Sequence, residues 1–281
     1  MQTIFLNRYF PEEFLDYYPE DVLDVPDNQY APVNMPNKAW NVPPIFRQFT
    51  DTSPEELGIP DIGNINVTLP DSKVKELRRA YYAATSYGDY ELGRIIDELY
   101  NQGLENDTMI VFWGDHGWQL GEHDEWCKQN LFEITNRVPM MIKIPGVTDK
   151  GMKSSNLVEL VDIFPTLVEA AGFASLEPCP NQEEARKVQL CTEGRSLMPL
   201  INKSDKEWED TVFWQYDEDW YHDKIVPNSM GYSVRTSDYR YTEYVAMRDL
   251  GGYNWEPEWD NPVDHEELYD LRKDPQENIN V

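Results

Sequence analysis

The pattern of apolar and polar positions divides the chain into three parts, and each part predicts a different kind of structure. Residues 1–70 carry many prolines among aromatic and acidic residues, which excludes long helices and central strands. We expect this segment to be irregular and to pack on a neighbouring core. Residues 71–205 combine helical and strand-like patterns and predict an α/β core, whereas residues 206–281 alternate with a period of two and predict a small antiparallel subdomain.

A long helix is predicted at the start of the second part. Apolar residues recur there at helical spacing from about Pro70 onward. Asp71 or Ser72 is expected to cap the helix, Gly88 to interrupt it and Gly103 to end it. Its tyrosines are expected to pack rather than to catalyse, namely Tyr81, Tyr82, Tyr87 and Tyr90.

Two apolar runs after this helix predict strands. Residues 109–113 read Met-Ile-Val-Phe-Trp and are followed by Gly114, which is typical of a strand buried on both faces of a sheet. Residues 138–144 predict another strand. A helix followed by a strand is half of a βαβ unit, so we expect a mostly parallel sheet flanked by helices.

A second amphipathic helix is predicted over residues 156–171, kinked or restarted at Pro165 and ended by Gly172. Ser154 or Ser155 suits a helix cap better than a nucleophile. The third part then predicts strands, with hairpin chemistry between the second and third of them. They are residues 211–216, 231–236, 239–245 and 267–271.

The net charge of the chain limits the classes of partner that it can bind. It has 24 basic and 52 acidic residues, a formal net charge of −28, which argues against nucleic acid because such surfaces need a basic footprint. This charge would also repel a polyanionic substrate at neutral pH, and protonation in an acidic compartment would ease the repulsion. Simple solubility explains the charge equally well. No apolar run approaches the roughly 20 residues of a membrane span, and the first eight residues are too short and polar for a signal peptide.

Cysteines and sequons favour the secretory route, so we expect a lysosomal or secreted protein. Cys179 and Cys191 lie twelve positions apart in a loop and are plausible disulfide partners, worth about 3 kcal/mol in the chain-entropy model. Cys127 is expected to be a small buried apolar residue. Three glycosylation sequons are present, at Asn66, Asn106 and Asn202.

The candidate chemistry gathers where the strand at residues 109–113 ends. Asp115 and His116 follow it directly, and ligands bind at this end of the strands in open α/β sheets. Asp115 offers carboxylate oxygens and His116 an imidazole nitrogen, and Lys128 on the following loop can return an ammonium to the same place. From spacing alone, a turn residue explains Asp115 about as well as a metal ligand does.

Several motifs resemble the sulfatase family. The most specific is DHGWQLGEHDEWCK, which begins at Asp115 and is followed by RVPM and IPG. VDIFPTL, MGYSVRTSDYRYTEY and ELYDLRKDPQENIN extend the likeness through most of the chain. The resemblance implies an alkaline-phosphatase-like α/β fold, in which residues 71–205 form the C-terminal half of the core and residues 206–281 the antiparallel α+β subdomain.

The resemblance also implies an activity, namely hydrolysis of sulfuric esters in sulfated glycosaminoglycans, with the 2-O-sulfate of iduronate in heparan and dermatan sulfate as the target. It assigns Asp115 and His116 to a bound calcium, and Lys128 to the sulfate as a catalytic residue. It places Trp118 at the substrate pocket, although a core tryptophan is about as plausible. It makes Glu122 and His123 groups that order the loop.

Other residues depart from the family pattern. The family nucleophile is a formylglycine made from cysteine in a Cys-x-Pro/Ala-x-Arg frame, and Cys191-Thr-Glu-Gly-Arg195 keeps only the spacing. Asp124 stands where the family has glycine, and His222 and Lys224 are the only cationic candidates for binding the uronate. We expect the nucleophile to come from a segment preceding Met1, so this chain alone should hydrolyse no aryl sulfate. Two alternatives stay open: a zinc-dependent phosphatase or phosphodiesterase of the same superfamily, and a non-catalytic secreted protein that kept the fold.

Overall fold

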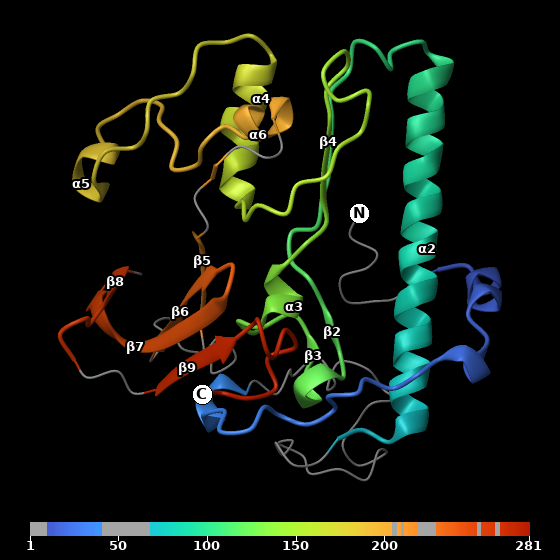
Figure 1. Ribbon diagram of the computed structural model, residues 1–281, viewed down its shortest axis with the longest axis vertical. Helices are drawn as coiled ribbons and strands as arrows, with labels where there is room; N and C mark the ends of the chain where they lie inside the picture. Colours follow the sequence, from blue (N-terminus) through green and yellow to red (C-terminus); the bar gives the residue numbers. More distant parts are fainter. Residues whose placement is uncertain are drawn as a thin grey trace.

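The chain forms an open, elongated arrangement (Figure 1). The computed structural model describes residues 10–40, 68–203, 207–208, 211–217, 229–251, 254–261 and 265–281. Helix α2 stands along one side of the molecule and the C-terminal sheet lies toward the other, with the chain between β1 and β4 placed between them (Figure 1). None of the described helices is both long and apolar enough to cross a bilayer.

Helix α2 spans Asp71–Asn101, and two expectations about it were wrong. Neither Asp71 nor Ser72 caps it: Pro70 is the N-cap, and its carbonyl accepts the first two helical hydrogen bonds. Gly88 does not interrupt it, because one glycine inside a helix costs only about 1 kcal/mol relative to alanine. Gly103 follows the helix with a φ of +69°, which is the left-handed conformation that ends many helices.

The described part of the N-terminal segment forms short 3-10 turns, of which the first two pack along α2 and the third packs against Leu131 and Phe132. These are η1 (Glu12–Tyr17), η2 (Glu20–Val22) and η3 (Asn37–Ala39). Phe14 of η1 is buried, and its ring makes edge contacts with Tyr87 and Tyr90 of α2 at centroid distances of 5.3 and 6.0 Å. These tyrosines therefore pack against the N-terminal segment.

Strands β1 (Ile110–Trp113) and β4 (Met140–Lys143) pair antiparallel. The expectation of a strand buried on both faces was wrong, since Trp113 is 41% exposed and Met141 60%. In the described part of the chain β4 is the only strand beside β1, so apolar side chains on both faces lack cover. All ladders between described strands are antiparallel, because the connection from β1 to β4 contains a hairpin and a short helix rather than the crossover that parallel pairing needs.

The helix predicted over residues 156–171 is shorter than expected. It consists of a 3-10 turn, η6 (Leu160–Asp162), that runs into α4 (Ile163–Ala170). Pro165 therefore lies in the first turn of α4, where its missing N–H costs nothing and no kink is required. Gly172 ends the helix with a φ of +79°, as predicted.

The cap of this helix is also different from the prediction. Glu159 and Asp162 form a capping box, so neither Ser154 nor Ser155 caps the helix. The side chain of Asp162 additionally accepts a hydrogen bond from the backbone N–H of Arg195 at 2.8 Å. This carboxyl group therefore joins the helix start to the end of the disulfide loop.

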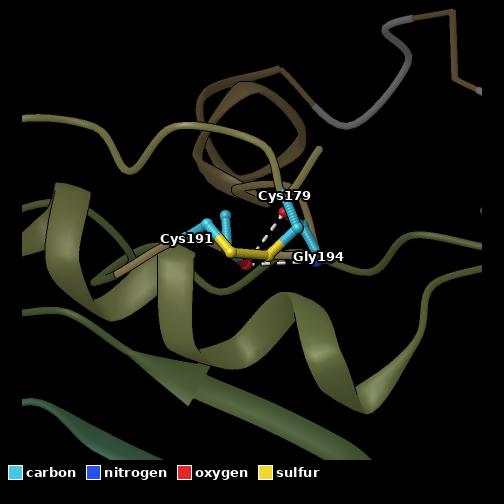
Figure 2. Close-up of a disulfide and its surroundings, with 4 residues drawn as sticks. Cys179, Cys191 and Gly194 are labelled. Carbon is cyan, nitrogen blue, oxygen red and sulfur yellow. Dashed lines mark hydrogen bonds between the residues drawn. A yellow bond between two sulfur atoms is a disulfide. The ribbon is translucent and has the colours of Figure 1, made fainter. Parts of the chain in front are cut away.

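A disulfide joins Cys179 to Cys191 (Figure 2). Close to it, Gly194 lies against the backbone of Val161, where an added Cβ would come within 2.2 Å of the carbonyl oxygen. Only glycine permits this close approach. The loop contains the short helix α5 (Gln182–Ala185) and leads into α6 (Met198–Asn202).

The C-terminal part is an antiparallel sheet of five strands in the order β5-β6-β7-β8, with β9 also paired to β7. The strands are β5 (Thr211–Asp217), β6 (Ser229–Thr236), β7 (Tyr239–Gly251), β8 (Asn254–Pro257) and β9 (His265–Asp270). The four predicted strands are confirmed, and the edge strand β8 was not predicted. Leu131 and Phe132 pack against the inner face of this sheet together with Tyr244 and Tyr269.

Candidate functional site

A small hairpin brings the predicted site residues together. Strands β2 (Gln119–Leu120) and β3 (Trp126–Cys127) pair antiparallel, and the turn between them contains the 3-10 turn η5 (Glu122–Asp124). The segment that holds His116 enters this hairpin and Lys128 leaves it, so both residues lie at its base. The sequence predicted only a loop here, because strands of two residues are too short to show a period.

Asp115, His116 and Lys128 converge at the hairpin base. The Lys128 Nζ atom lies 2.9 Å from His116 Nε2, and Asp115 Oδ2 lies 3.5 Å from the same nitrogen. An acid, an imidazole and an amine that are up to thirteen positions apart in the sequence thus face one point.

The tautomer of His116 follows from its neighbours. Its Nδ1 atom lies 2.8 Å from the carbonyl oxygen of Gly117. A carbonyl only accepts hydrogen bonds and a lysine ammonium only donates them. Nδ1 therefore carries the proton, and the lone pair of Nε2 faces Lys128. A backbone carbonyl that orients an imidazole in this way is characteristic of histidines that bind metal ions.

Helix α3 (Glu133–Asn136) fixes the backbone beside His116. Gly117 donates its N–H to the carbonyl of Thr135 at 2.7 Å. A Cβ on Gly117 would lie 2.1 Å from the carbonyl oxygen of Ile134, so glycine is required where the two segments meet. The position of His116 is therefore tied to α3 as well as to the hairpin.

Burial lowers the pKa of Lys128, while the charge of Asp115 acts in the opposite direction. Lys128 is partly buried, so its ammonium keeps only part of its water shell. A cation held in this way interacts more strongly with an anion than a fully solvated lysine does.

Trp118 lies between the hairpin base and α2. Its ring stacks on Tyr81 at a centroid distance of 5.9 Å, and the ring centroid of His116 lies 6.3 Å from that of Trp118. Trp118 therefore forms a wall of the site that is anchored to α2. Its role in binding a substrate stays a prediction.

Glu122 connects the turn of the hairpin to α2. One carboxylate oxygen accepts from the Leu120 N–H at 2.6 Å, and the other pairs with Arg78 at 3.1 Å. Arg78 also donates to the hydroxyl of Tyr82 at 3.1 Å. The loop that carries Lys128 is thereby fixed to a long helix.

The residues that sequence reasoning missed are buried polar groups behind the hairpin. Gln119, Glu125 and Asn130 are all nearly inaccessible to solvent and hydrogen-bond to one another through Asn130. A polar residue in a predicted loop is normally assigned to the surface. The only signal in the sequence is their place between the apolar residues Leu120, Trp126, Leu131 and Phe132.

Asp115 and His116 would supply only part of the ligand shell of a calcium ion. Calcium takes six to eight ligands, mostly oxygens, and Asp115 and His116 supply two donors. Within the described ranges, no group of three or more His, Cys, Asp or Glu residues could hold a metal ion. The Asp115 side chain is 63% exposed, which leaves room for further ligands. The pair therefore fits as part of a shared cation site.

Comparison with known proteins decides the family. A model described as "Sulfatase" matches residues 28–173, and a model described as "N-sulphoglucosamine sulphohydrolase, C-terminal" matches residues 121–281. The chain belongs to the sulfatase family. The predicted family is thus confirmed by matches that together cover most of the chain.

Individual relatives agree with this membership. Iduronate 2-sulfatase of Mus musculus is 31% identical over 279 residues, covering 85% of this chain and 49% of the relative. Choline-sulfatase of Rhizobium meliloti is 33% identical over 221 residues, covering 79% of this chain and 36% of the relative. The iduronate 2-sulfatase of Homo sapiens is also 31% identical over 279 residues, and half of its length is covered. This sulfatase chain therefore spans half or less of the curated relatives it matches here.

Solved structures confirm the predicted sulfatase fold. A protein determined in complex with its substrate, D-glucosamine-2-N,6-O-disulfate, has a TM-score of 0.56 and 25% identity, covering 74% of this chain and 37% of that chain. The phosphonate monoester hydrolase of Agrobacterium radiobacter has a TM-score of 0.64 and 22% identity, covering 98% of this chain and 50% of that chain. The second likeness concerns the fold alone.

The remaining predicted residues have mixed outcomes. Asn66, His222 and Lys224 lie outside the described residues. Asn106 and Asn202 are exposed, as an acceptor of glycosylation must be. Cys127 is buried and forms no disulfide, whereas Cys191 is bonded to Cys179, so the Cys191–Arg195 frame offers no thiol.

Asp124 is expected to destabilise the sulfatase chain at neutral and alkaline pH. Burial raises its pKa from 3.8 to about 8. Below about pH 4 the carboxyl is protonated in both the folded and the unfolded chain; above it the unfolded chain loses the proton first, so stability falls as the pH rises toward 8. Asp124→Asn keeps the shape and tolerates the left-handed backbone (φ +60°).

We expect the Asn variant to match the natural chain near pH 4 and to be more stable by about 1–2 kcal/mol near pH 8, a discounted value because water still reaches the group. Urea unfolding at the two pH values measures this difference. The exposed Asp97→Asn provides the control. A variant whose advantage is the same at both pH values would contradict the assignment.

Proposed function

We propose that this chain supplies part of the catalytic centre of a sulfatase that removes sulfate from glycosaminoglycans. The proposed unit is the 2-O-sulfated iduronate of heparan and dermatan sulfate. The observation that carries the proposal is the convergence of Lys128 and Asp115 on the Nε2 atom of His116. Two relatives named iduronate 2-sulfatase support the substrate.

Asp115 and His116 would hold one side of a calcium ion. Asp115 offers the hard oxygen ligands that calcium prefers, and the carbonyl of Gly117 keeps the Nε2 lone pair of His116 available. The bound ion would place positive charge beside the sulfate oxygens. With an ion present, Lys128 would turn from His116 to the sulfate.

Lys128 would bind a sulfate oxygen and stabilise the charge that grows during sulfuryl transfer. Its ammonium is partly desolvated and fixed at the hairpin base, so little reorganisation precedes the reaction. The surface around it is strongly acidic, with a net charge of −28 over the chain. We therefore propose a lysosomal or otherwise secreted setting, with glycosylation at the three sequons. Protonation of carboxylates in an acidic compartment would reduce the repulsion of a sulfated polymer.

We propose that the nucleophile comes from outside these 281 residues. Two of the three cysteines form a disulfide, the third is buried, and none lies in a Cys-x-Pro/Ala-x-Arg frame. We propose that the family's formylglycine is supplied by another segment. The purified 281-residue chain is then expected to release no sulfate from an aryl sulfate or from a 2-O-sulfated disaccharide.

The proposal is tested by a metal titration of the 281-residue chain, followed by NMR of the His116 imidazole. Calcium is expected to shift the His116 signals, and Asp115→Ala to abolish that shift. Asp97→Ala removes an exposed carboxylate of α2 and should leave the shift unchanged. Zinc in place of calcium would favour the phosphatase or phosphodiesterase alternative. If neither ion shifts His116, or if the shift survives Asp115→Ala, the assignment of Asp115 and His116 as cation ligands is wrong, and the non-catalytic alternative is favoured.

A further inference from the structure

A row of buried polar side chains runs behind the hairpin base. Gln119, His123 and Asn130 are at most 6% exposed. The row begins at the backbone N–H of Phe132 and ends at the backbone carbonyl of Gln276. It therefore connects the segment after Lys128 to the C-terminal tail, about 150 positions away in the sequence.

The two ends of this row fix the direction of every hydrogen bond in it. The Phe132 N–H only donates, so the atom of Asn130 that faces it at 3.2 Å is the oxygen. The Asn130 amide nitrogen then donates to Gln119 Oε1, and Gln119 Nε2 donates to His123 Nδ1 at 3.1 Å. Finally, His123 Nε2 donates to the Gln276 carbonyl at 2.7 Å. Reversing one amide would place donors against donors.

This row needs a neutral His123 with its proton on Nε2. Burial lowers the pKa of His123 from 6.5 to about 4, so the imidazole is neutral at ordinary pH. The ring also lies on Phe132 at a centroid distance of 4.2 Å. The charged groups acting on it are Arg240, which disfavours the imidazolium, and Asp274, which favours it.

The row lies directly behind the site residues. Gln119 pairs with Cys127 across the hairpin, and Lys128 follows Cys127. Asn130 comes two residues later and also donates to Glu125 at 2.5 Å. The row is therefore bonded to the strand ends that hold Lys128 opposite His116.

The C-terminal tail is itself held in place. Glu277, next to Gln276, accepts from the N–H of Glu133 at 2.7 Å and forms an ion pair with Arg240. Glu133 begins α3, whose Thr135 carbonyl binds Gly117 beside His116. The tail thus contacts the hairpin and α3, the two elements that fix the site.

We propose that His123 is a positioning residue: it joins the C-terminal tail to the hairpin and so holds the Lys128 amine at Nε2 of His116. The proposal rests on the site of the proposed function and assigns that site a control point outside the reacting groups. His123 adopts a φ of +60°, a strained conformation for histidine that persists when the surroundings determine it.

Two substitutions separate the two links that His123 makes. His123→Asn places an amide near Nδ1, where its oxygen accepts from Gln119 but no donor reaches Gln276. His123→Gln places an amide near Nε2, where it donates to Gln276 but no acceptor reaches Gln119. Asparagine also tolerates the left-handed backbone. His265→Asn, on β9, is the matched control, since it removes an imidazole that the row does not contain.

The measurement is NMR of the ligand-free chain. Long-range proton–nitrogen spectra report the tautomer of each histidine, and the carbon-13 signals of methylated lysines report the surroundings of Lys128. The natural chain and His265→Asn should show His116 with its proton on Nδ1 and a Lys128 signal distinct from those of the exposed lysines. In each His123 variant we expect His116 to become a mixture of tautomers and the Lys128 signal to move toward those of the exposed lysines.

Folded His123 variants with natural His116 and Lys128 signals would overturn the proposal and leave His123 a packing residue. If the variants do not fold, the natural chain still decides: a charged His123 at neutral pH, or one protonated on Nδ1, contradicts the directed row. These signals need no calcium or sulfate. Failure of the calcium titration would therefore reject the proposed function separately.

Discussion

Glu277→Ala is expected to lower the free energy of unfolding by about 3–5 kcal/mol, because it leaves a buried charge without its partner. Glu277 is 1% exposed and its partner Arg240 is fully buried. The Arg240 guanidinium lies 5.1 Å from the ring centre of Phe132 and 4.6 Å from that of Tyr269. The guanidinium would therefore lose its carboxylate partner at a site that solvent does not reach.

The pKa values of both partners are raised, which favours the charged form of Arg240 but the neutral form of Glu277. Burial alone would lower the pKa of Arg240, but the carboxylates of Glu277 and Glu267 raise it. Burial raises the pKa of Glu277 in spite of Arg240. Arginine does not lose its proton in proteins, so the guanidinium of Arg240 is charged. Its positive charge lies next to the Glu277 carboxyl and favours the ionised form of that group.

Urea unfolding of Glu277→Ala measures this cost. The matched control is Glu91→Ala, since Glu91 pairs with Arg94 on the exposed surface of α2 and should change stability by less than about 1 kcal/mol. The double variant Arg240→Met with Glu277→Leu removes both charges and should recover much of the loss. Similar effects of the two alanine variants would show that the buried ion pair is not needed.

The sequence predicted the strands of the C-terminal sheet because one face of each strand is buried and the other is not. It did not predict which face of β7 is buried. Tyr239, Tyr241 and Glu243 on one face are about as apolar as Arg240, Thr242 and Tyr244 on the other. The structure buries Arg240, Thr242 and Tyr244, since Glu277 on the tail neutralises the arginine. A partner 37 positions away leaves no trace in a local pattern.

The residues of the site were predictable from the sequence, but the hairpin that brings them together was not. Asp115 and His116 end an apolar strand, so their place at a sheet end follows from the pattern. Lys128 was placed near them because it lies on the following loop, and the family motif gave its role. The hairpin that brings Lys128 to His116 did not follow, because it depends on buried side chains of Gln119 and Asn130. The exposure of β1 was mispredicted for a related reason: its apolar pattern describes a strand covered on both faces, and β4 alone does not cover it.

Lys128→Met should have the largest effect on catalysis. In any preparation that contains this chain and releases sulfate from a 2-O-sulfated disaccharide, we expect kcat/KM to fall by about 10²–10³, the usual loss when one group that stabilises the transition state is removed. Methionine keeps the length of the side chain and removes the charge. Lys128→Arg should restore little, because a planar guanidinium cannot occupy the place of a compact ammonium 2.9 Å from His116 Nε2.

Lys150→Met is the control for the loss of charge, since Lys150 is exposed on the loop after β4. It should keep the natural kcat/KM, and both methionine variants should keep the natural unfolding temperature. The ratio of the two losses separates a local role from the general effect of a more acidic surface, since each variant changes the net charge equally. Equal losses of kcat/KM in the two methionine variants would mean that Lys128 acts only through the overall charge of the surface and is not a residue of the site. A large loss confined to Lys128, with kcat reduced more than KM is raised, would mean that the amine acts on the transition state more than on the bound ester.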